Sequence, residues 1–145
     1  MTVRCGTDIV AVRRIEEALQ RYGERFVQRL LTEAERDVLG HLPDISEGML
    51  RYAERLAARF AGKEAVAKAL RTGIYGEHGV YWHDIEILRD TGGAPVLRLS
   101  GQAQRCYLSL GGTSIDVSLS HDSGLAIACC VMLCAPSKMN RIEGE

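Results

Sequence analysis

The sequence predicts an α+β fold in which a small antiparallel sheet packs on a long central helix. An alanine-rich segment runs from about residue 49 to residue 70, and alanine favours helix and permits close packing. Apolar and polar residues alternate at 115–120, and an apolar run follows at 125–133, as expected for a strand hairpin. A second hairpin pattern at 85–99 adds strands, so helix and antiparallel sheet are expected in one chain.

The chain has the length and composition of a single globular domain. Its 145 residues are 46% hydrophobic and 26% charged, which is ordinary for a protein that buries a core. We expect one domain over residues 1–135 and a polar tail over residues 136–145.

The segment before the central helix is expected to form one strand and several short helices. Residues 3–10 have the pattern of a strand that ends at Asp8, and a helix follows directly at Val12–Tyr22, with Ile15, Leu19 and Tyr22 on one stripe. Gly23 suits the C-terminus of this helix. The remaining segments are one or two helical turns at 26–31, a helix to Gly40 opened by a Thr32–Glu35 capping box, and a loop at 41–48.

The segment after the central helix is expected to be mainly β-structure. The helix should stop near Gly73, and a loop should follow at 76–79. The later elements are strands at 85–89 and 96–99 joined by a turn at 90–93, a helix from Ser100 to Leu110, and strands at 115–120 and 125–133. The last strand is apolar without alternation, so we expect burial on both of its faces. His121 to Gly124 should form the turn before it.

Charge and hydropathy exclude several classes of function. The formal net charge of −1 argues against a general nucleic-acid binder, which is normally strongly basic. Arg4 and Asp8 interrupt any apolar signal-peptide region, and no stretch approaches the ~18 apolar residues that span a bilayer. The five cysteines lack a paired CxxC spacing and suit a reducing compartment. We therefore expect a cytoplasmic protein that binds neither nucleic acid nor membrane.

Asp8, Glu64 and Lys68 are the first candidates for chemistry. Glu64 and Lys68 lie about 40° apart in helical projection, and Asp8 ends the first predicted strand. Ordinary structural roles also exist for them. Asp8 would cap a helix, and a Glu four residues before a Lys forms a surface pair worth only ~0.3–0.5 kcal/mol.

The position of Glu64 on the central helix favours a metal-binding function. Glu64 borders the stripe expected to face the core rather than opposing it; that stripe comprises Leu56, Phe60, Ala67 and Leu70. A partly shielded carboxylate gains by binding a hard cation, which offsets its desolvation cost. Magnesium typically takes one or two carboxylates plus substrate phosphate. Asp8 and Glu64 would supply that number, with Lys68 placed to hold a phosphate.

His121 and Asp122 form a further candidate site at the predicted hairpin tip. An ordinary polar turn accounts for them equally well. The functional interpretation is a titratable imidazole at a rigid strand end, where it contacts phosphate or moves a proton. The sequence has neither a Walker-type loop nor a GxGxxG pattern, so we do not expect a glycine-rich loop to bind phosphate.

In this order, these residues resemble the holo-acyl-carrier-protein synthases, the bacterial stand-alone 4′-phosphopantetheinyl transferases. The similarity covers about residues 3–133. The blocks that carry it are Gly6-Thr7-Asp8-Ile9-Val10 leading to Arg14-Ile15, Arg59-Phe60-Ala61-Gly62-Lys63-Glu64-Ala65-Val66-Ala67-Lys68-Ala69, and Val117-Ser118-Leu119-Ser120-His121-Asp122. The hairpin Ile85-Glu86-Ile87-Leu88-Arg89-Asp90 with Gly93-Ala94-Pro95 also looks like that of the family. Blocks of this kind, correctly spaced in a chain of this length, are specific.

The resemblance implies transfer of the phosphopantetheine arm of coenzyme A to a serine of an apo-acyl carrier protein, with release of adenosine 3′,5′-bisphosphate. Such enzymes serve fatty-acid and other lipid biosynthesis. The implied structure is the compact α+β fold of 4′-phosphopantetheinyl transferases, assembled as a homotrimer with active sites between subunits. Magnesium would be held by Asp8 and Glu64, and Lys68 would contact the phosphate.

The resemblance also implies roles for other residues. The catalytic group would comprise Glu64, Lys68, His121 and Asp122. The coenzyme A site would comprise Arg59, Lys68, Thr72, Gly73 and His121. The carrier protein would dock on Arg14, Arg21 and Arg25. Phosphoryl-type transfer requires positioning and charge neutralisation more than covalent catalysis, and this residue set offers both.

Alternatives remain open at the level of sequence. The proton of the attacking serine has three possible acceptors: a metal-bound water, Glu64, or the His121–Asp122 pair. Arg4 and Arg71 stand where the family commonly has glycine, and Arg71 projects within about 20° of Glu64, where it would contact phosphate or pair with Glu64. Alternative functions are a non-catalytic module that binds coenzyme A or the carrier, and a small magnesium-dependent pyrophosphate hydrolase.

Overall fold

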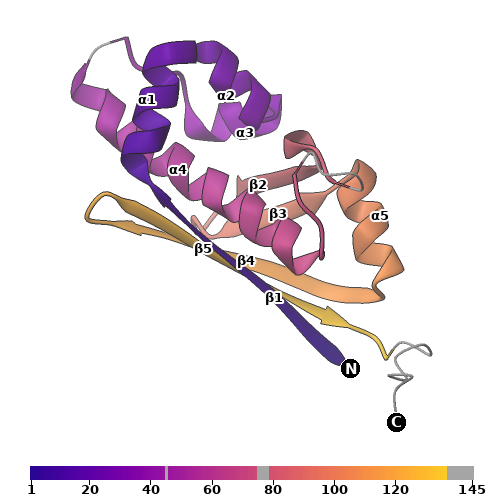
Figure 1. Cartoon of the computed structure of the whole chain (residues 1–145). Helices are drawn as coiled ribbons and strands as arrows, with labels where there is room; N and C mark the ends of the chain where they lie inside the picture. Colours follow the sequence, from indigo (N-terminus) through magenta and orange to yellow (C-terminus); the bar gives the residue numbers. More distant parts are fainter. Residues whose placement is uncertain (45, 75–78, 137–145) are drawn as a thin grey trace.

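The computed structural model describes residues 1–44, 46–74 and 79–136. Its elements, in chain order, are β1 (Thr2–Ala11), α1 (Val12–Tyr22), α2 (Glu24–Leu30), α3 (Glu33–Leu39), α4 (Ser46–Ala69), the 3₁₀ turn η1 (Trp82–Asp84), β2 (Ile85–Arg89), β3 (Pro95–Leu99), α5 (Gly101–Ser109), β4 (Gly112–Asp122) and β5 (Leu125–Cys134). The predicted α+β class is confirmed, with small antiparallel sheets and a long central helix (Figure 1).

The long helix α4 lies across one face of a three-stranded antiparallel sheet. The strand order is β1-β5-β4, so β5 is central, and β2 and β3 form a separate hairpin. Helix α4 packs on all three strands of the larger sheet and also contacts β2 (Figure 1). Ala126 and Ala128 of β5 are fully buried, and their small side chains allow α4 to lie close to the strand.

Glycines set the distance between α4 and its neighbours. A Cβ atom at Gly6 would collide with the carbonyl oxygen of Ala65 and would lie 2.9 Å from the Lys68 Cβ. On another side of α4, a Cβ at Gly62 would lie 2.6 Å from Ile87 Cδ1. The absence of side chains at these positions brings β1 against the face of α4 that carries Ala65 and Lys68, and β2 against another side of the helix.

A buried ion pair and its hydrogen bonds connect four elements of the fold: α3, α4, η1 and β2. Lys63 Nζ lies 2.7 Å from Glu35 Oε1, and both side chains are fully buried. Lys63 also donates to the carbonyl of Trp82 at 2.8 Å, while Glu35 Oε2 accepts from the backbone N–H of Ile87 at 3.1 Å. Burial lowers the pKa of Lys63, and the Glu35 carboxylate opposes that shift. The predicted capping box at Thr32 is confirmed, but no local sequence pattern indicates that Glu35 also binds Lys63.

The prediction that the last strand is buried on both faces is wrong for the single chain. Burial alternates strictly along most of β5, because α4 covers only one face of the sheet. The opposite face, here called the outer face, carries exposed apolar side chains from β1 and β5. They are Val3, Ile9, Leu125, Ile127 and Val131, which are 44–63% exposed.

Several boundaries differ from the sequence expectations. Helix α4 begins at Ser46 rather than at about residue 49, and β4 begins at Gly112 rather than at 115. The last hairpin turns at Ser123 and Gly124, which have φ angles of 50° and 79°, so His121 and Asp122 lie in β4 and not in the turn. Most of the loop expected at 76–79, and the tail from 137 onward, lie outside the described residues.

Candidate active site

Asp8 and Lys68 meet where β1 packs on α4. Lys68 Nζ lies 3.1 Å from Asp8 Oδ1 and donates to the carbonyl oxygen of Thr7 at 2.9 Å. The contact depends on the close approach at Gly6, since that glycine brings β1 within reach of the last turns of α4. Asp8 is partly buried, whereas Lys68 is about half exposed. The structure thus brings together the acid and the base that the sequence separates by sixty residues.

Glu64 belongs to the same group of charges. Burial raises the pKa of Glu64, and the neighbouring Asp8 carboxylate raises it further, while Lys68 and Arg14 oppose the shift. Asp8 therefore lies near enough to repel the Glu64 carboxylate, in a partly desolvated position. Two carboxylates that repel one another are a suitable donor set for a divalent cation.

The donor set of this group suits magnesium better than a metal that requires a protein cage. Among the described residues, no cluster of three or more His, Cys, Asp or Glu side chains could hold a metal ion. Magnesium keeps several waters and takes only one or two carboxylates together with substrate phosphate. Asp8 and Glu64 fit that requirement, and Lys68 beside them provides a positive charge for a phosphate.

Arg59 and His121 lie in a second group, in a cavity of about 180 Å³ between α4, the β2–β3 hairpin and β4. Arg59 is only 4% exposed, and burial together with the positive charges of Arg89 and Arg55 lowers its pKa to about 10. His121 Nδ1 lies 3.0 Å from Glu54 Oε2 of α4. Glu54 was not foreseen, because it lies far from His121 in the sequence and no local pattern marks it.

The two groups lie on opposite flanks of α4. Asp8 of β1 and Leu119 of β4 both pair with Ala128 of β5, and Val10 and His121 both pair with Ala126. Asp8 and His121 are therefore on strands separated by β5, over which α4 lies. The lining of the 180 Å³ cavity does not include Asp8, Glu64 or Lys68. A single chain does not bring all the expected coenzyme A contacts into one cavity.

Asp122 lines a third region at the end of the last hairpin. A cavity of about 300 Å³ is formed there by residues of α1, α4 and the hairpin: Val12, Glu54, His121, Asp122, Ser123, Gly124 and Leu125. Asp122 is exposed at the end of β4, and His121 lines both this cavity and the smaller one beside Arg59. The predicted pair therefore shares a cavity, with Glu54 rather than Asp122 bonded to the imidazole.

Thr72 and Gly73 follow the end of α4 directly. The backbone N–H groups of Arg71 and Thr72 donate to the carbonyls of Lys68 and Ala67, each at 3.0 Å, which is the hydrogen-bond pattern of a Schellman cap. Arg71 has a φ of 59°, the left-handed conformation usually taken by glycine at this position. The predicted projection of Arg71 beside Glu64 is wrong, because α4 ends at Ala69 and the backbone turns at Arg71.

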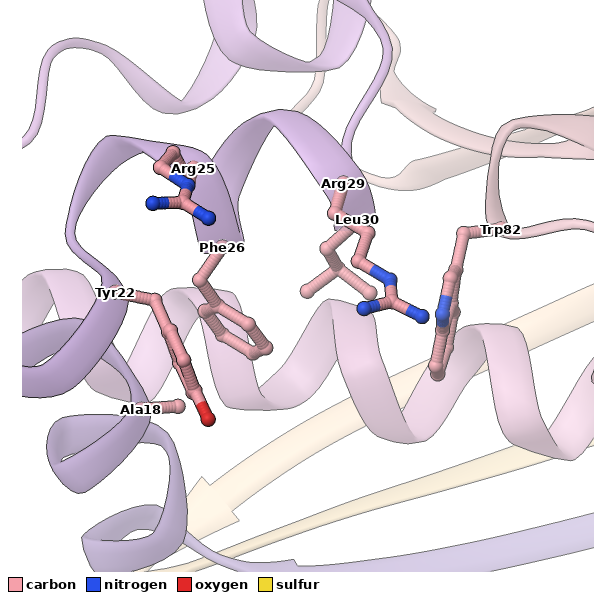
Figure 2. A pocket seen from close by; sticks show the side chains of 7 residues that line it. All are labelled: Ala18, Tyr22, Arg25, Phe26, Arg29, Leu30 and Trp82. Carbon is pink, nitrogen blue, oxygen red and sulfur yellow. The ribbon is translucent and has the colours of Figure 1, made fainter.

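Arg25 and Arg29 of α2 line a larger cavity of about 440 Å³. Figure 2 shows its lining, which comes from α1, α2 and η1 and comprises Ala18, Tyr22, Arg25, Phe26, Arg29, Leu30 and Trp82. Arg25 lies on this cavity, Arg21 stacks 5.4 Å from the centre of the Tyr22 ring, and Arg14 is exposed near Glu64. Tyr22 was expected on one stripe of the helix with Ile15 and Leu19, yet it is half exposed while those two residues are buried. Aromatic residues spaced four apart among arginines were the available signal for this cavity.

Comparison with known proteins agrees with the family expected from the sequence. The 4′-phosphopantetheinyl transferase superfamily matches residues 4–130. The holo-[acyl-carrier-protein] synthase of Chloroflexus aurantiacus is 46% identical over 132 residues, covering 85% of this chain and 92% of that protein. The synthase of Desulforudis audaxviator is 41% identical over 97% of this chain and 99% of its own length.

Solved structures show the same fold. The crystal structure of Helicobacter pylori holo-[acyl-carrier-protein] synthase in complex with coenzyme A superimposes with a TM-score of 0.72 at 32% sequence identity. The match covers 89% of this chain and 99% of that chain. The expected fold and the expected resemblance are both confirmed: the chain belongs to the 4′-phosphopantetheinyl transferase superfamily.

Proposed function

We propose that the chain is a holo-acyl-carrier-protein synthase, which transfers the 4′-phosphopantetheine arm of coenzyme A to a serine of an apo-acyl carrier protein and releases adenosine 3′,5′-bisphosphate. The observation that carries this proposal is the group formed by Asp8, Glu64 and Lys68 in a chain of this family. The relatives named above are synthases, which favours a transferase over a non-catalytic binding module of the same fold.

Asp8 and Glu64 would hold magnesium at this site. The bound ion would supply Lewis-acid neutralisation of the charge that develops on the departing bisphosphate. Lys68 would bind a phosphate oxygen of the coenzyme A diphosphate, exchanging its contact with Asp8 for that oxygen. These side chains come from a strand and a helix that are locked together at Gly6, so little reorganisation is needed during the reaction.

The carrier protein would dock on the face of α1 and α2. Arg14, Arg21 and Arg25 would attract an acidic carrier, and steering of this kind raises the association rate most at low salt. The 440 Å³ cavity beside Arg25 adds an apolar surface from Tyr22, Phe26 and Trp82. A docking face that combines aromatic residues with arginines has the composition of a protein interface.

We propose that copies of the chain assemble as a homotrimer through the outer face of the sheet. The five apolar side chains of that face are exposed in one chain, and their contiguity on β1 and β5 suits a second copy. Assembly would also explain why Arg59 and His121 lie apart from Asp8, Glu64 and Lys68. One coenzyme A molecule would span a subunit boundary and contact both groups.

The compartment proposed is the cytoplasm. Within the described ranges, no helix has both the length and the apolarity to cross a membrane. The exposed Cys5 and Cys129 thiols suit a reducing environment, and the proposed role is in fatty-acid and lipid biosynthesis.

Product analysis separates this proposal from its alternatives. The protein is incubated with coenzyme A and magnesium, with and without an apo-acyl carrier protein, and adenosine 3′,5′-bisphosphate is measured by chromatography. Release that depends on the carrier supports the transferase. Release without any carrier would identify a pyrophosphate hydrolase, and tight binding of coenzyme A without release would identify a binding module.

A further inference from the structure

Arg4 is a cation without a counter-ion on one edge strand of the larger sheet. It lies on β1, and its side chain is partly buried. The Arg4 Nε atom is buried and has no hydrogen-bond partner among the described residues, and none of the ion pairs of those residues includes Arg4. Since native proteins rarely leave a buried polar group unpaired, these observations indicate that Arg4 gains a partner from outside the single chain.

Asp116 is an anion without a counter-ion on the opposite edge strand. It is exposed on β4 and pairs with Val131, so it lies on the outer face of the sheet. Within residues 1–44, 46–74 and 79–136, no basic side chain comes within ion-pair distance of Asp116. Covering the outer face with another chain would bury this carboxylate, which is costly unless a cation pairs with it.

The hydrogen bonds of the sheet place the Asp116 carboxylate at the open edge of β4. Thr7 Oγ1 donates to the carbonyl of Ala128 at 3.0 Å, so this carbonyl points toward β1. Bonded directions alternate along an antiparallel strand, so the backbone of Val131 points toward β4, and the N–H of Val117 points away from β5. Asp116 Oδ1 accepts that N–H at 2.8 Å. The carboxylate is therefore turned to the edge, where a neighbouring chain can reach it.

Arg4 and Asp116 lie at nearly the same level of the sheet but on opposite edges. Cys5, which follows Arg4, and Asp116 both pair with Val131 of β5. Because β5 separates β1 from β4 by two strand spacings, about 10 Å in all, one chain does not bring the two charges together. A second copy can do so by rotation, without a shift along the strands. A contact that joins two different patches in this way closes into a ring when it is repeated.

Such a ring would also complete the proposed active site. Asp8, Glu64 and Lys68 lie where β1 packs on α4, whereas Arg59 and His121 lie on the β4 side of the same helix. If the β1 edge of one copy meets the β4 edge of the next, these two groups approach one another across the subunit boundary.

We propose that Arg4 of each copy binds Asp116 of the next copy, and that this ion pair fixes the head-to-tail order of the assembly, with β1 of one subunit beside β4 of its neighbour. The inference rests on the homotrimer of the proposed function. The pair is particular to this chain, because Arg4 stands where the family commonly has glycine. A guanidinium and a carboxylate form strong, directional hydrogen bonds, so the pair selects one arrangement of the copies.

Light scattering over a range of protein concentrations tests the pair. Arg4→Gln and Asp116→Asn each remove one charge, and each should raise the concentration at which the trimer dissociates by about tenfold. Arg4→Glu and Asp116→Arg place like charges together and should weaken the trimer further. The double variant Arg4→Glu, Asp116→Arg restores opposite charges and should assemble nearly as well as the wild type. Arg105→Glu is the control, since Arg105 is exposed on α5 and bonds to Gln102.

Mixing the two reversal variants tests whether the pair crosses between subunits. Every mixed ring of three contains two contacts in which opposite charges meet, so an equimolar mixture of Arg4→Glu and Asp116→Arg should form more trimer than either variant alone. Circular dichroism melts confirm that each variant is folded. Reversal variants that assemble as well as the wild type would overturn the proposal, as would a double variant or a mixture that assembles no better than the single variants.

These outcomes remain distinct from the outcome for the proposed function. Rescue of assembly by the charge swap without any transfer to a carrier would support the ion pair and refute the transferase. Carrier modification by a trimer that is insensitive to both reversals would support the transferase and refute the ion pair. A monomeric wild type that modifies the carrier would refute both the assembly and the pair while the transferase stands.

Discussion

Lys68 Nζ lies 3.1 Å from Asp8 Oδ1, so the lysine occupies the carboxylate that we expect to hold a cation. Lys68 and the cation therefore compete for Asp8 until a substrate phosphate draws the ammonium away. Replacement of Lys68 by Met should raise the affinity of the protein for Mn²⁺ in the absence of coenzyme A. The same variant should lose about 10–100-fold in kcat/KM for coenzyme A, because one charge-assisted phosphate contact is removed.

Electron paramagnetic resonance of free Mn²⁺ measures the first effect, and transfer assays measure the second. Lys68→Arg is the matched control, since it retains the charge and should keep both properties closer to the wild type. Weaker Mn²⁺ binding in Lys68→Met would contradict the competition between the lysine and the ion.

Glu64 is expected to lower stability while it enables catalysis. Its pKa is raised by burial and by Asp8, so the folded state holds this proton more strongly than the unfolded state does. The protonated Glu64 carboxyl therefore makes its full contribution to folding stability at low pH, and this contribution is lost as the pH rises through the raised pKa of Glu64. Glu64→Gln should therefore unfold at a higher temperature than the wild type at pH 7 without magnesium, and this difference should shrink toward pH 4.

Transfer by Glu64→Gln should be at least a hundredfold slower than transfer by the wild type at equal magnesium, because one of the two carboxylates proposed to hold the metal is lost. Thermal melts at several pH values and carrier assays measure the two effects on the same preparations. A variant that melts lower and turns over normally would remove Glu64 from the metal site.

Arg71 stores backbone strain at the end of α4. Its φ of 59° costs a residue with a side chain about 1–2 kcal/mol. Glycine avoids this cost, but the greater entropy of its unfolded chain offsets part of the gain. Arg71→Gly should raise the free energy of unfolding by about 0.5–1 kcal/mol, as measured by urea denaturation. Arg71→Asn should recover part of this gain, and Arg71→Ala none. A stabilised Arg71→Ala variant would show that the guanidinium charge, not the backbone, is responsible.

The Glu35–Lys63 pair should be strongly coupled. Removing one member leaves a buried charge without its partner, so Lys63→Met alone should cost about 3–5 kcal/mol. The double variant Glu35→Gln with Lys63→Met should be more stable than the sum of the single effects predicts. A double-mutant cycle by chemical denaturation measures this coupling, and strict additivity would mean that the 2.7 Å contact contributes no interaction energy.

The outer face of the sheet should hold the trimer together. Ile127→Glu places a charge among the exposed apolar side chains of β1 and β5, and it should shift the protein from trimer to monomer in light scattering. Transfer activity should fall with it, because the two halves of the coenzyme A site would separate. Leu108→Glu is the control, since Leu108 is equally apolar and 61% exposed on α5, away from the outer face. A monomeric wild type with full activity would contradict the proposed assembly.

Local patterns in the sequence predicted local structure well. The Thr32–Glu35 capping box depends on residues three apart, and it forms as expected. The Lys63–Glu35 pair and the His121–Glu54 contact join residues that are distant in the chain, so no spacing rule could reveal them. The proximity of Asp8 and Lys68 followed from the resemblance, while its physical cause, the absence of a side chain at Gly6, appears only in the packing of β1 on α4.

The errors have physical causes of the same kind. Continuous apolar character in 125–133 suggested two buried faces, but one chain supplies a helix for only one face of the sheet. The predicted helical projection of Arg71 was wrong because the position of a helix end depends on backbone conformation. A glycine would have marked the left-handed residue at this end, whereas an arginine gives no such signal in the sequence.

The most direct test of the account is the intact mass of an apo-acyl carrier protein after incubation with coenzyme A, magnesium and this protein. The wild type should add the mass of one phosphopantetheine group to each carrier molecule, and the Asp8→Asn, Glu64→Gln double variant should add none. A carrier mass that stays unchanged with the wild type, or that rises equally with the double variant, would contradict the claim that these two carboxylates support the transfer.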